Sequence, residues 1–200
     1  MSGWKGGEET KPSWDDTYMA LAFTIAQRSV DQNTVHGAIM VSKDNRLLSM
    51  GYNGPLRGVQ FKEDDLTNRN SKYFLMIHAE ENCIINYHGS HSDLDGATMY
   101  ITGEPCHRCL RMILQKGIRR IVYGPVGSSK HCIDDDDRKA KQLMIEGVNY
   151  NNITTVVNVD SMVIEKHRHK ELEYYQHEDP DGVKEVLNKT LKYIDYKENS

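Results

Sequence analysis

Apolar residues recur at helical spacing near the start of the chain and then gather into short runs. Residues 13–16 resemble a helix-capping box, and the apolar positions after them predict a helix over residues 14–30. Two apolar runs, residues 37–41 and 47–52, are separated by a polar turn and predict a β-hairpin. The Asn-Gly-Pro sequence at 53–55 ends its second strand.

The pattern then alternates between helices and strands. Residues 55–77 are polar and irregular, so we expect a loop over a site there. The elements expected after it are a helix over 78–87, a strand over 97–102, a helix over 106–115, a strand over 120–123, a helix over 138–146 and a strand over 153–159. Strand–helix–strand units join parallel strands by right-handed crossovers. The sequence therefore predicts an α/β fold, a three-layer α/β/α domain around a five-stranded mixed sheet.

Length and composition fit one domain with an extension at each end. The chain has 200 residues, of which 38% are hydrophobic and 27% are charged, as is typical of a soluble globular protein. We expect a flexible leader over residues 1–12, the main domain over 13–159 and a C-terminal helical extension over 160–200. The apolar stripe of that extension, between residues 183 and 194, needs a partner surface.

Charge and hydropathy limit the partners. The start of the chain lacks the apolar segment of a signal peptide, and no apolar run approaches membrane-spanning length. We therefore expect a cytoplasmic protein that does not enter a membrane. A net charge of −4 gives no general attraction to nucleic acid, so we expect no nucleic-acid partner.

The most specific chemical pattern is a divided set of metal ligands. His78 and Glu80 come before one predicted strand, and a Pro-Cys-x-x-Cys run with Cys106 and Cys109 follows that strand. One histidine and two cysteines are suited to Zn²⁺ but are one ligand short of a closed structural site, which leaves a position for water. In a reducing compartment the cysteine pair is more plausible as ligands than as a disulfide.

Both parts of this set are predicted at helix starts. Cys106 and Cys109 lie three residues apart on one helix face, where the partial positive charge of the helix N-terminus favours thiolates. Zinc would lower the pKa of a bound water from about 15.7 toward about 7, and Glu80 would carry its proton to a substrate. We predict one Zn²⁺ per chain on His78, Cys106 and Cys109. This arrangement is the signature of zinc-dependent nucleobase deaminases.

Other interpretations of these residues stay open. A His-x-Glu match alone is weak, because it also occurs at residues 169–171 with no cysteine nearby, whereas Pro-Cys-x-x-Cys is far rarer. The cysteine pair could be a thioredoxin-like redox pair, or part of a structural zinc module closed by Cys83 or His107. We expect Cys83 and Cys132 to be packing or loop residues. The run Asp134–Asp137 either binds Mg²⁺ carried by a nucleoside triphosphate or forms a solvated helix start.

Four stretches of the sequence, which include the ligand motifs, match the motifs of a known protein family. They are Gly51-Tyr52-Asn53-Gly54, His78 to Asn82, Gly96 to Tyr100, and Glu104 to Cys109. Together they resemble the cytidine deaminase-like superfamily and, more closely, its deoxycytidylate (dCMP) deaminases, over residues 13–159. The resemblance implies hydrolysis of dCMP to dUMP and ammonia in the supply of dTTP precursors. It also implies a homohexamer that is activated by dCTP and inhibited by dTTP.

The resemblance implies roles for single residues as well. Asn53 contacts the deoxyribose, with Gly54 in the same motif. The Ala79 amide meets the base carbonyl, and Glu80 works at N3 and the leaving amine. Tyr123 joins the substrate-binding candidates because the end of the fourth strand helps to choose the substrate in such folds.

The sequence departs from the family pattern near the substrate. Pro55 comes one position early, His36 replaces a small apolar residue, and the segment 127–137 is longer than usual. Arg57, Lys130 and His131 are candidates for a phosphate contact, with ordinary loop charge as the alternative. The alternative functions are a deaminase of another nucleotide or base, such as a modified dCMP or a tRNA adenosine, and a non-catalytic structural zinc module.

Overall fold

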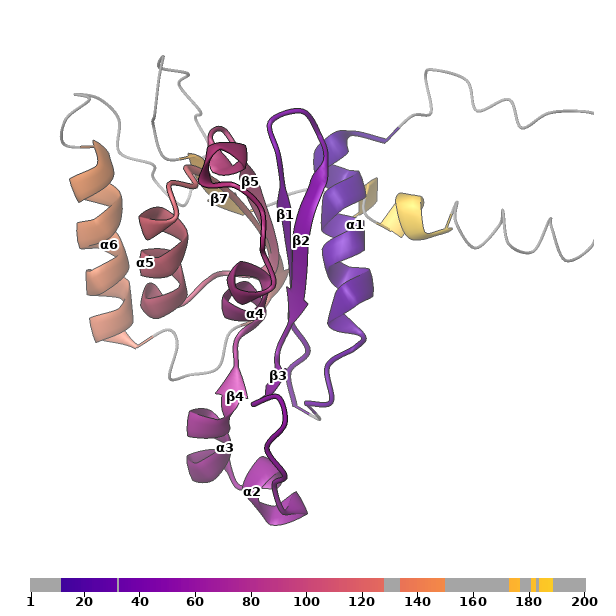
Figure 1. Cartoon of the computed structure of the whole chain (residues 1–200), viewed down its shortest axis with the longest axis vertical. Helices are drawn as coiled ribbons and strands as arrows, with labels where there is room; N and C mark the ends of the chain where they lie inside the picture. The colour runs from indigo at the N-terminus through magenta and orange to yellow at the C-terminus, as the bar shows by residue number, and fades with distance from the viewer. Residues whose placement is uncertain are drawn as a thin grey trace, which may run out of the picture.

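A mixed β-sheet forms the centre of the computed structural model, which describes residues 12–31, 33–127, 134–149, 173–176, 181–182 and 184–188 (Figure 1). Its order is β2-β1-β5-β6-β7, with bounds β1 Gly37–Val41, β2 Leu47–Tyr52, β5 Thr98–Gly103, β6 Arg120–Val126 and β7 Glu173–Gln176. Strand β1 is antiparallel to β2 and β5, whereas β5, β6 and β7 are parallel. The predicted α/β fold with a mixed sheet is confirmed.

Helices cover both faces of this sheet. Helix α1 (Trp14–Ala26) lies on one face, and α4 (Ala79–Ile85), α5 (His107–Gln115) and α6 (Asp135–Asn149) lie on the other (Figure 1). Alternating side chains of β1 divide the core between the two faces. Ile39 and Val41 pack in the cluster on the α1 side, while Ala38 and Met40 pack in the cluster on the α4 and α5 side.

The predicted capping box at the start of α1 is present. The Asp16 N–H donates to the Ser13 hydroxyl at 3.0 Å, and the Ser13 N–H donates to the Asp16 carboxylate at 3.3 Å. The helix ends at Ala26, earlier than predicted, because the next N–H groups bond to carbonyls only three residues back and tighten the last turn.

Several later boundaries follow from cap chemistry. Helices α4 and α5 begin one residue later than predicted, with His78 and Cys106 as their N-cap residues. Helix α6 begins before the predicted position 138, because the Asp134 carboxylate accepts the Asp137 N–H at 2.8 Å and acidic residues stabilise a helix start.

The prediction of an irregular loop over residues 55–77 is wrong. The segment contains α2 (Glu63–Thr67) and α3 (Arg69–Leu75), and it is closed by antiparallel pairing of β3 (Gly54–Pro55) with β4 (Met76–Ile77). This unit hangs below one end of the sheet (Figure 1). Helices this short lie below the window of about eleven residues over which helical periodicity can be recognised, so their sequence carries no helical signal.

The C-terminal region supplies the strand beside β6. The strand predicted at 153–159 lies outside the described residues, so the predicted set of five strands is not confirmed; in the described sheet β7 occupies the edge beside β6. Residues 181–182 and 184–188 are helical, and Val186 packs against the cluster on the α1 side. The division of the chain at residue 160 remains a prediction. Within the described ranges, no helix is both long and apolar enough to cross a membrane.

Gly51 sets how closely α4 approaches the sheet. A Cβ atom at this position of β2 would lie 2.3 Å from the Cys83 nitrogen and 2.4 Å from the Ala79 oxygen. We expect Gly51→Ala to push α4 away and to lower the free energy of unfolding by about 1–3 kcal/mol, the usual cost of overpacking. Urea denaturation would measure the change.

The matched control is Gly147→Ala in α6, where a Cβ atom would meet nothing within 4 Å. Alanine is the better helix former, so this variant should gain up to about 1 kcal/mol. Equal denaturation midpoints for the two variants would contradict the close approach of α4.

Candidate metal centre and active site

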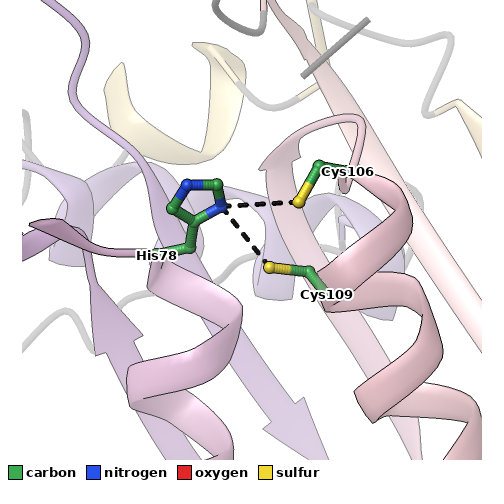
Figure 2. Close-up of side chains that lie close together, drawn as sticks. All are labelled: His78, Cys106 and Cys109. Carbon is green, nitrogen blue, oxygen red and sulfur yellow. Dashed lines mark hydrogen bonds between the residues drawn. The ribbon is translucent and has the colours of Figure 1, made fainter. Parts of the chain in front are cut away.

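Two helix N-termini bring the predicted metal ligands together. His78 is the N-cap residue of α4, Cys106 is the N-cap residue of α5, and Cys109 lies in the first turn of α5. The His78 Nδ1 atom is 3.7 Å from the Cys106 Sγ and 3.4 Å from the Cys109 Sγ (Figure 2). The three ligand atoms all lie within 4.8 Å of one another.

This spacing fits a tetrahedral zinc ion. With Zn–N bonds of about 2.0 Å and Zn–S bonds of about 2.3 Å, nitrogen and sulfur ligands lie roughly 3.5 Å apart. The observed separations of 3.4 and 3.7 Å lie on either side of that value. Both cysteines are free thiols and are buried, so the site offers a shielded donor set of the kind that zinc prefers.

Protons compete with a metal at this cluster. A hydrogen bond with Cys106 raises the pKa of His78 to about 9, although burial acts to lower it. A hydrogen bond with Cys106 and burial raise the pKa of Cys109. Ligands must be deprotonated to coordinate, so zinc binding releases protons here and weakens as the pH falls.

Glu80 lies beside the cluster in the first turn of α4 and is only 5% exposed. Burial raises the pKa of its carboxyl group, against the lowering effects of the His78 charge and of a hydrogen bond with Cys109. A carboxyl group with a raised pKa holds and releases a proton nearer to neutral pH. The geometry therefore suits Glu80 to proton transfer next to the metal ligands.

The substrate-binding candidates on the sheet and helix ends are ordered and mostly buried. Asn53 is 7% exposed and precedes Gly54 at the start of β3. Ala79 is the first residue of α4 and is fully buried. Tyr123 lies in β6 within the core cluster, and burial raises the pKa of its hydroxyl to about 12. Its side chain therefore packs in the core, and its contact with a substrate stays a prediction.

The structure describes only one of the candidates for a phosphate contact, Arg57. An Arg57 guanidinium nitrogen donates to the Asn86 Oδ1 at 3.3 Å. Asn86 is the C-cap of α4, the opposite end of that helix from His78, so the structure does not bring Arg57 to the ligand cluster. Three residues whose roles remain predictions lie outside the described part of the chain: Lys130, His131 and Cys132.

The proposed fourth ligands of a closed site are engaged elsewhere. The His107 N–H donates to the Asp137 Oδ1 at 2.6 Å, and the His107 Nδ1 lies 2.8 Å from the same oxygen. Cys83 is fully buried, and burial raises its pKa to about 12. Neither residue belongs to the group of possible metal ligands found in the described part of the chain. The cluster formed there keeps three protein ligands.

Asp137 fits neither interpretation of the acidic run, the Mg²⁺ site or the solvated helix start. It is 1% exposed, and the Lys141 Nζ lies 3.0 Å from its Oδ2. Lys141 also pairs with Glu104 at 2.8 Å. Asp135 and Asp136 are exposed, as a solvated helix start requires, but Asp137 joins α6 to the start of α5.

Sequence reasoning missed Asp31 and Lys72. The Lys72 Nζ lies 2.5 Å from the Asp31 Oδ1, and their side chains are 14% and 7% exposed. No local motif signals this pair, because its members are far apart in the sequence and meet only in the fold.

A mixed sheet that carries a His-Cys-Cys cluster on two helix N-termini, with a buried glutamate beside it, defines the class of zinc-dependent nucleobase deaminases. Comparison with known proteins agrees. Residues 12–125 match the family described as the cytidine and deoxycytidylate deaminase zinc-binding region. The chain therefore belongs to the cytidine and deoxycytidylate deaminase family.

Individual relatives show which members of this family the chain resembles. Deoxycytidylate deaminase of Pongo abelii is 34% identical over 140 residues, 66% of this chain and 74% of that protein. The protein of the same name from Mus musculus is 31% identical over 164 residues, 74% of this chain and 87% of its own length. The apo crystal structure of dCMP deaminase from the cyanophage S-TIM5 has a TM-score of 0.51 and 28% identity, and the match covers 66% of this chain and 94% of that one.

We expect the purified protein to contain about one Zn²⁺ per chain, as three ligands in one cluster require. Cys106→Ala and Cys109→Ala should each lose the metal and melt at a lower temperature, because metal binding contributes to folding. Elemental analysis and thermal unfolding would measure both effects. Cys83→Ala is the control, since this buried thiol lies outside the ligand group. Full zinc content in Cys106→Ala would exclude the assigned ligands.

Proposed function

We propose that this chain is a zinc-dependent hydrolase that converts dCMP to dUMP and ammonia in the supply of dTTP precursors. The observation that carries the proposal is the three-ligand cluster with buried Glu80 beside it. The relatives named deoxycytidylate deaminase support dCMP as the substrate.

His78, Cys106 and Cys109 would hold the ion. Bound zinc acts as a Lewis acid that lowers the pKa of water to about 7. Glu80 takes the proton of the attacking water and delivers it to N3 of the cytosine ring, and it passes a second proton to the amine at C4. The water oxygen stays on C4, the C4–N bond breaks, and the two water protons end on N3 and on ammonia.

Two further residues of the chain would hold the substrate. The Ala79 N–H, at the first position of α4, has no acceptor within its own helix, so it can donate to the base carbonyl. Asn53 would contact the deoxyribose. Gly54, Tyr123, Arg57 and Lys130 complete the proposed surroundings of the nucleotide; the guanidinium of Arg57 contacts Asn86.

Membership of the family extends the proposal to assembly and regulation. It implies a homohexamer, activation by dCTP and inhibition by dTTP, and Mg²⁺ carried by the dCTP would bind at the acidic run. In the described acidic run, Asp137 is already paired with Lys141, which leaves Asp134, Asp135 and Asp136 as the exposed residues there.

We expect Glu80→Gln to retain zinc and the fold but to lose turnover by about 10²–10⁴-fold, the usual contribution of a general acid–base group. The amide fills the same space but cannot shuttle protons. Release of ammonia from dCMP would be measured alongside zinc content. Glu81→Gln, the same change on the next residue, should retain most of the activity. Near-normal turnover by Glu80→Gln would mean that another group carries the protons.

We expect dCMP to be used with a kcat/KM about ten- to a hundredfold above that of deoxycytidine, the range for one charge-assisted phosphate contact. A panel of dCMP, deoxycytidine, cytosine and tRNA, assayed for ammonia release, tests this preference. Equal or faster turnover of the nucleoside, the free base or the tRNA would replace dCMP by that substrate while leaving the zinc chemistry in place.

A further inference from the structure

The side-chain amide of Asn53 is held in one orientation by the protein. The His36 N–H donates to its Oδ1 at 2.7 Å, and its Nδ2 donates to the Thr34 carbonyl at 2.9 Å. A peptide N–H can only donate and a carbonyl can only accept, so the reversed amide would set donor against donor. The orientation of Asn53 is therefore fixed by its partners.

A carboxylate completes this arrangement. The second Nδ2 contact of Asn53 is the Asp31 Oδ2, at 3.4 Å. With both amide hydrogens directed at Thr34 and Asp31, the group that Asn53 can still offer to a ligand is the second lone pair of its Oδ1. Asn53 thus serves as an acceptor, and the donor that deoxyribose 5′-phosphate provides is its hydroxyl group.

Asp31 is itself held in place from several sides. Its Oδ1 accepts the N–H groups of Asn33 at 2.8 Å and Thr34 at 3.1 Å, and it pairs with the Lys72 Nζ at 2.5 Å. Burial acts to raise the pKa of Asp31, but the hydrogen bonds from Lys72 and these N–H groups outweigh it and lower the pKa. The carboxyl group is therefore charged at neutral pH and forms a largely buried ion pair with Lys72.

Lys72 connects Asp31 to the unit below the sheet. It belongs to α3, which leads through β4 directly into His78. The neighbouring Tyr73 accepts a hydrogen bond from Arg108 of α5, whose guanidinium also lies 5.1 Å from the Tyr73 ring centre. Helix α3 is thus fixed between the segment after α1 and the helix that carries the cysteines.

We propose that Lys72 and Asp31 are positioning residues for the substrate sugar. Lys72 fixes the Asp31 carboxylate, and this carboxylate holds the Asn53 amide with its oxygen as the acceptor. The inference rests on the proposed function, since Asn53 contacts the sugar only if the substrate is a nucleotide. A purely structural ion pair would stabilise the fold without acting through Asn53.

The first test is Lys72→Met, which removes the ammonium and keeps most of the side-chain length. The kcat/KM for dCMP should fall by up to about a hundredfold, as expected when a binding group is misplaced. The loss should appear mainly as a higher KM, and Lys72→Arg should restore much of it. Lys43→Met is the control, because Lys43 is exposed in the turn at the other end of β1.

A paired variant separates positioning from stability. Removing one partner of a buried ion pair destabilises a protein strongly, whereas replacing both is often neutral. Asp31→Asn combined with Lys72→Met should therefore regain stability but keep the loss in kcat/KM, because the new amide can no longer satisfy both the N–H groups and Asn53. A paired variant with wild-type kcat/KM would overturn the inference.

A mutant cycle with Asn53→Ala gives the decisive readout. If Lys72 acts through Asn53, Lys72→Met should cost less than about twofold in the Asn53→Ala background, since coupled residues are not additive. Independent, multiplying losses at equal zinc content would overturn the inference and leave the proposed function intact. Wild-type protein that releases no ammonia from dCMP would instead overturn the proposed function and this inference with it.

Discussion

The position of α4 on β2 determines the geometry of the whole candidate site, because His78, Ala79 and Glu80, the proposed metal ligand, base contact and proton carrier, lie at the start of this helix. Side-chain hydrogen bonds to the main chain set the position. The Ser49 hydroxyl donates to the Cys83 carbonyl at 2.7 Å, and the Asn82 amide donates to the Tyr52 carbonyl at 2.8 Å. Gly51 lies between them and leaves no room for a side chain. These short polar bonds fix the helix more closely than apolar contact alone, since a hydrogen bond tolerates little displacement.

Helix α5 is brought to the same site by the topology of the sheet. The parallel β5–α5–β6 crossover places the start of α5 at the end of β5, where the cysteines meet His78. Asp137 accepts the first N–H of α5, and it is held in turn by Lys141. Helix α6 thus holds the first turn of α5 in place. The positions of Cys106 and Cys109 therefore depend on the buried carboxylate of Asp137, which is not one of the proposed ligands.

The parts of the fold that the sequence predicted are those encoded by neighbouring residues. The capping box at Ser13, the hairpin and the placement of Cys106 at a helix start all depend on contacts within a few residues, and the structure contains each. Residues 55–77 carry no sequence signal of the helices α2 and α3. These short helices are stabilised by β3–β4 pairing and by contacts such as Tyr73 with Arg108, which no local pattern encodes. The site divides the same way. His78, Cys106 and Cys109 form one cluster as predicted. The spacing of residues along the sequence does not predict the contact between Asp31 and Lys72.

This division has a physical basis that bears on substrate choice. The deamination chemistry needs only two helix starts with fixed short motifs, and these motifs are readable in the sequence. The proposed recognition of the sugar uses an amide whose orientation is fixed, and three separate segments, around Asp31, Asn53 and Lys72, meet to fix it. Asp31 follows α1, Asn53 lies between β2 and β3, and Lys72 belongs to α3, so in the proposed enzyme a change in one of these segments would alter which nucleotide is accepted and leave His78, Cys106 and Cys109 in place. In the proposed enzyme, substrate preference is therefore a property of long-range packing, and the reaction type is a property of local sequence.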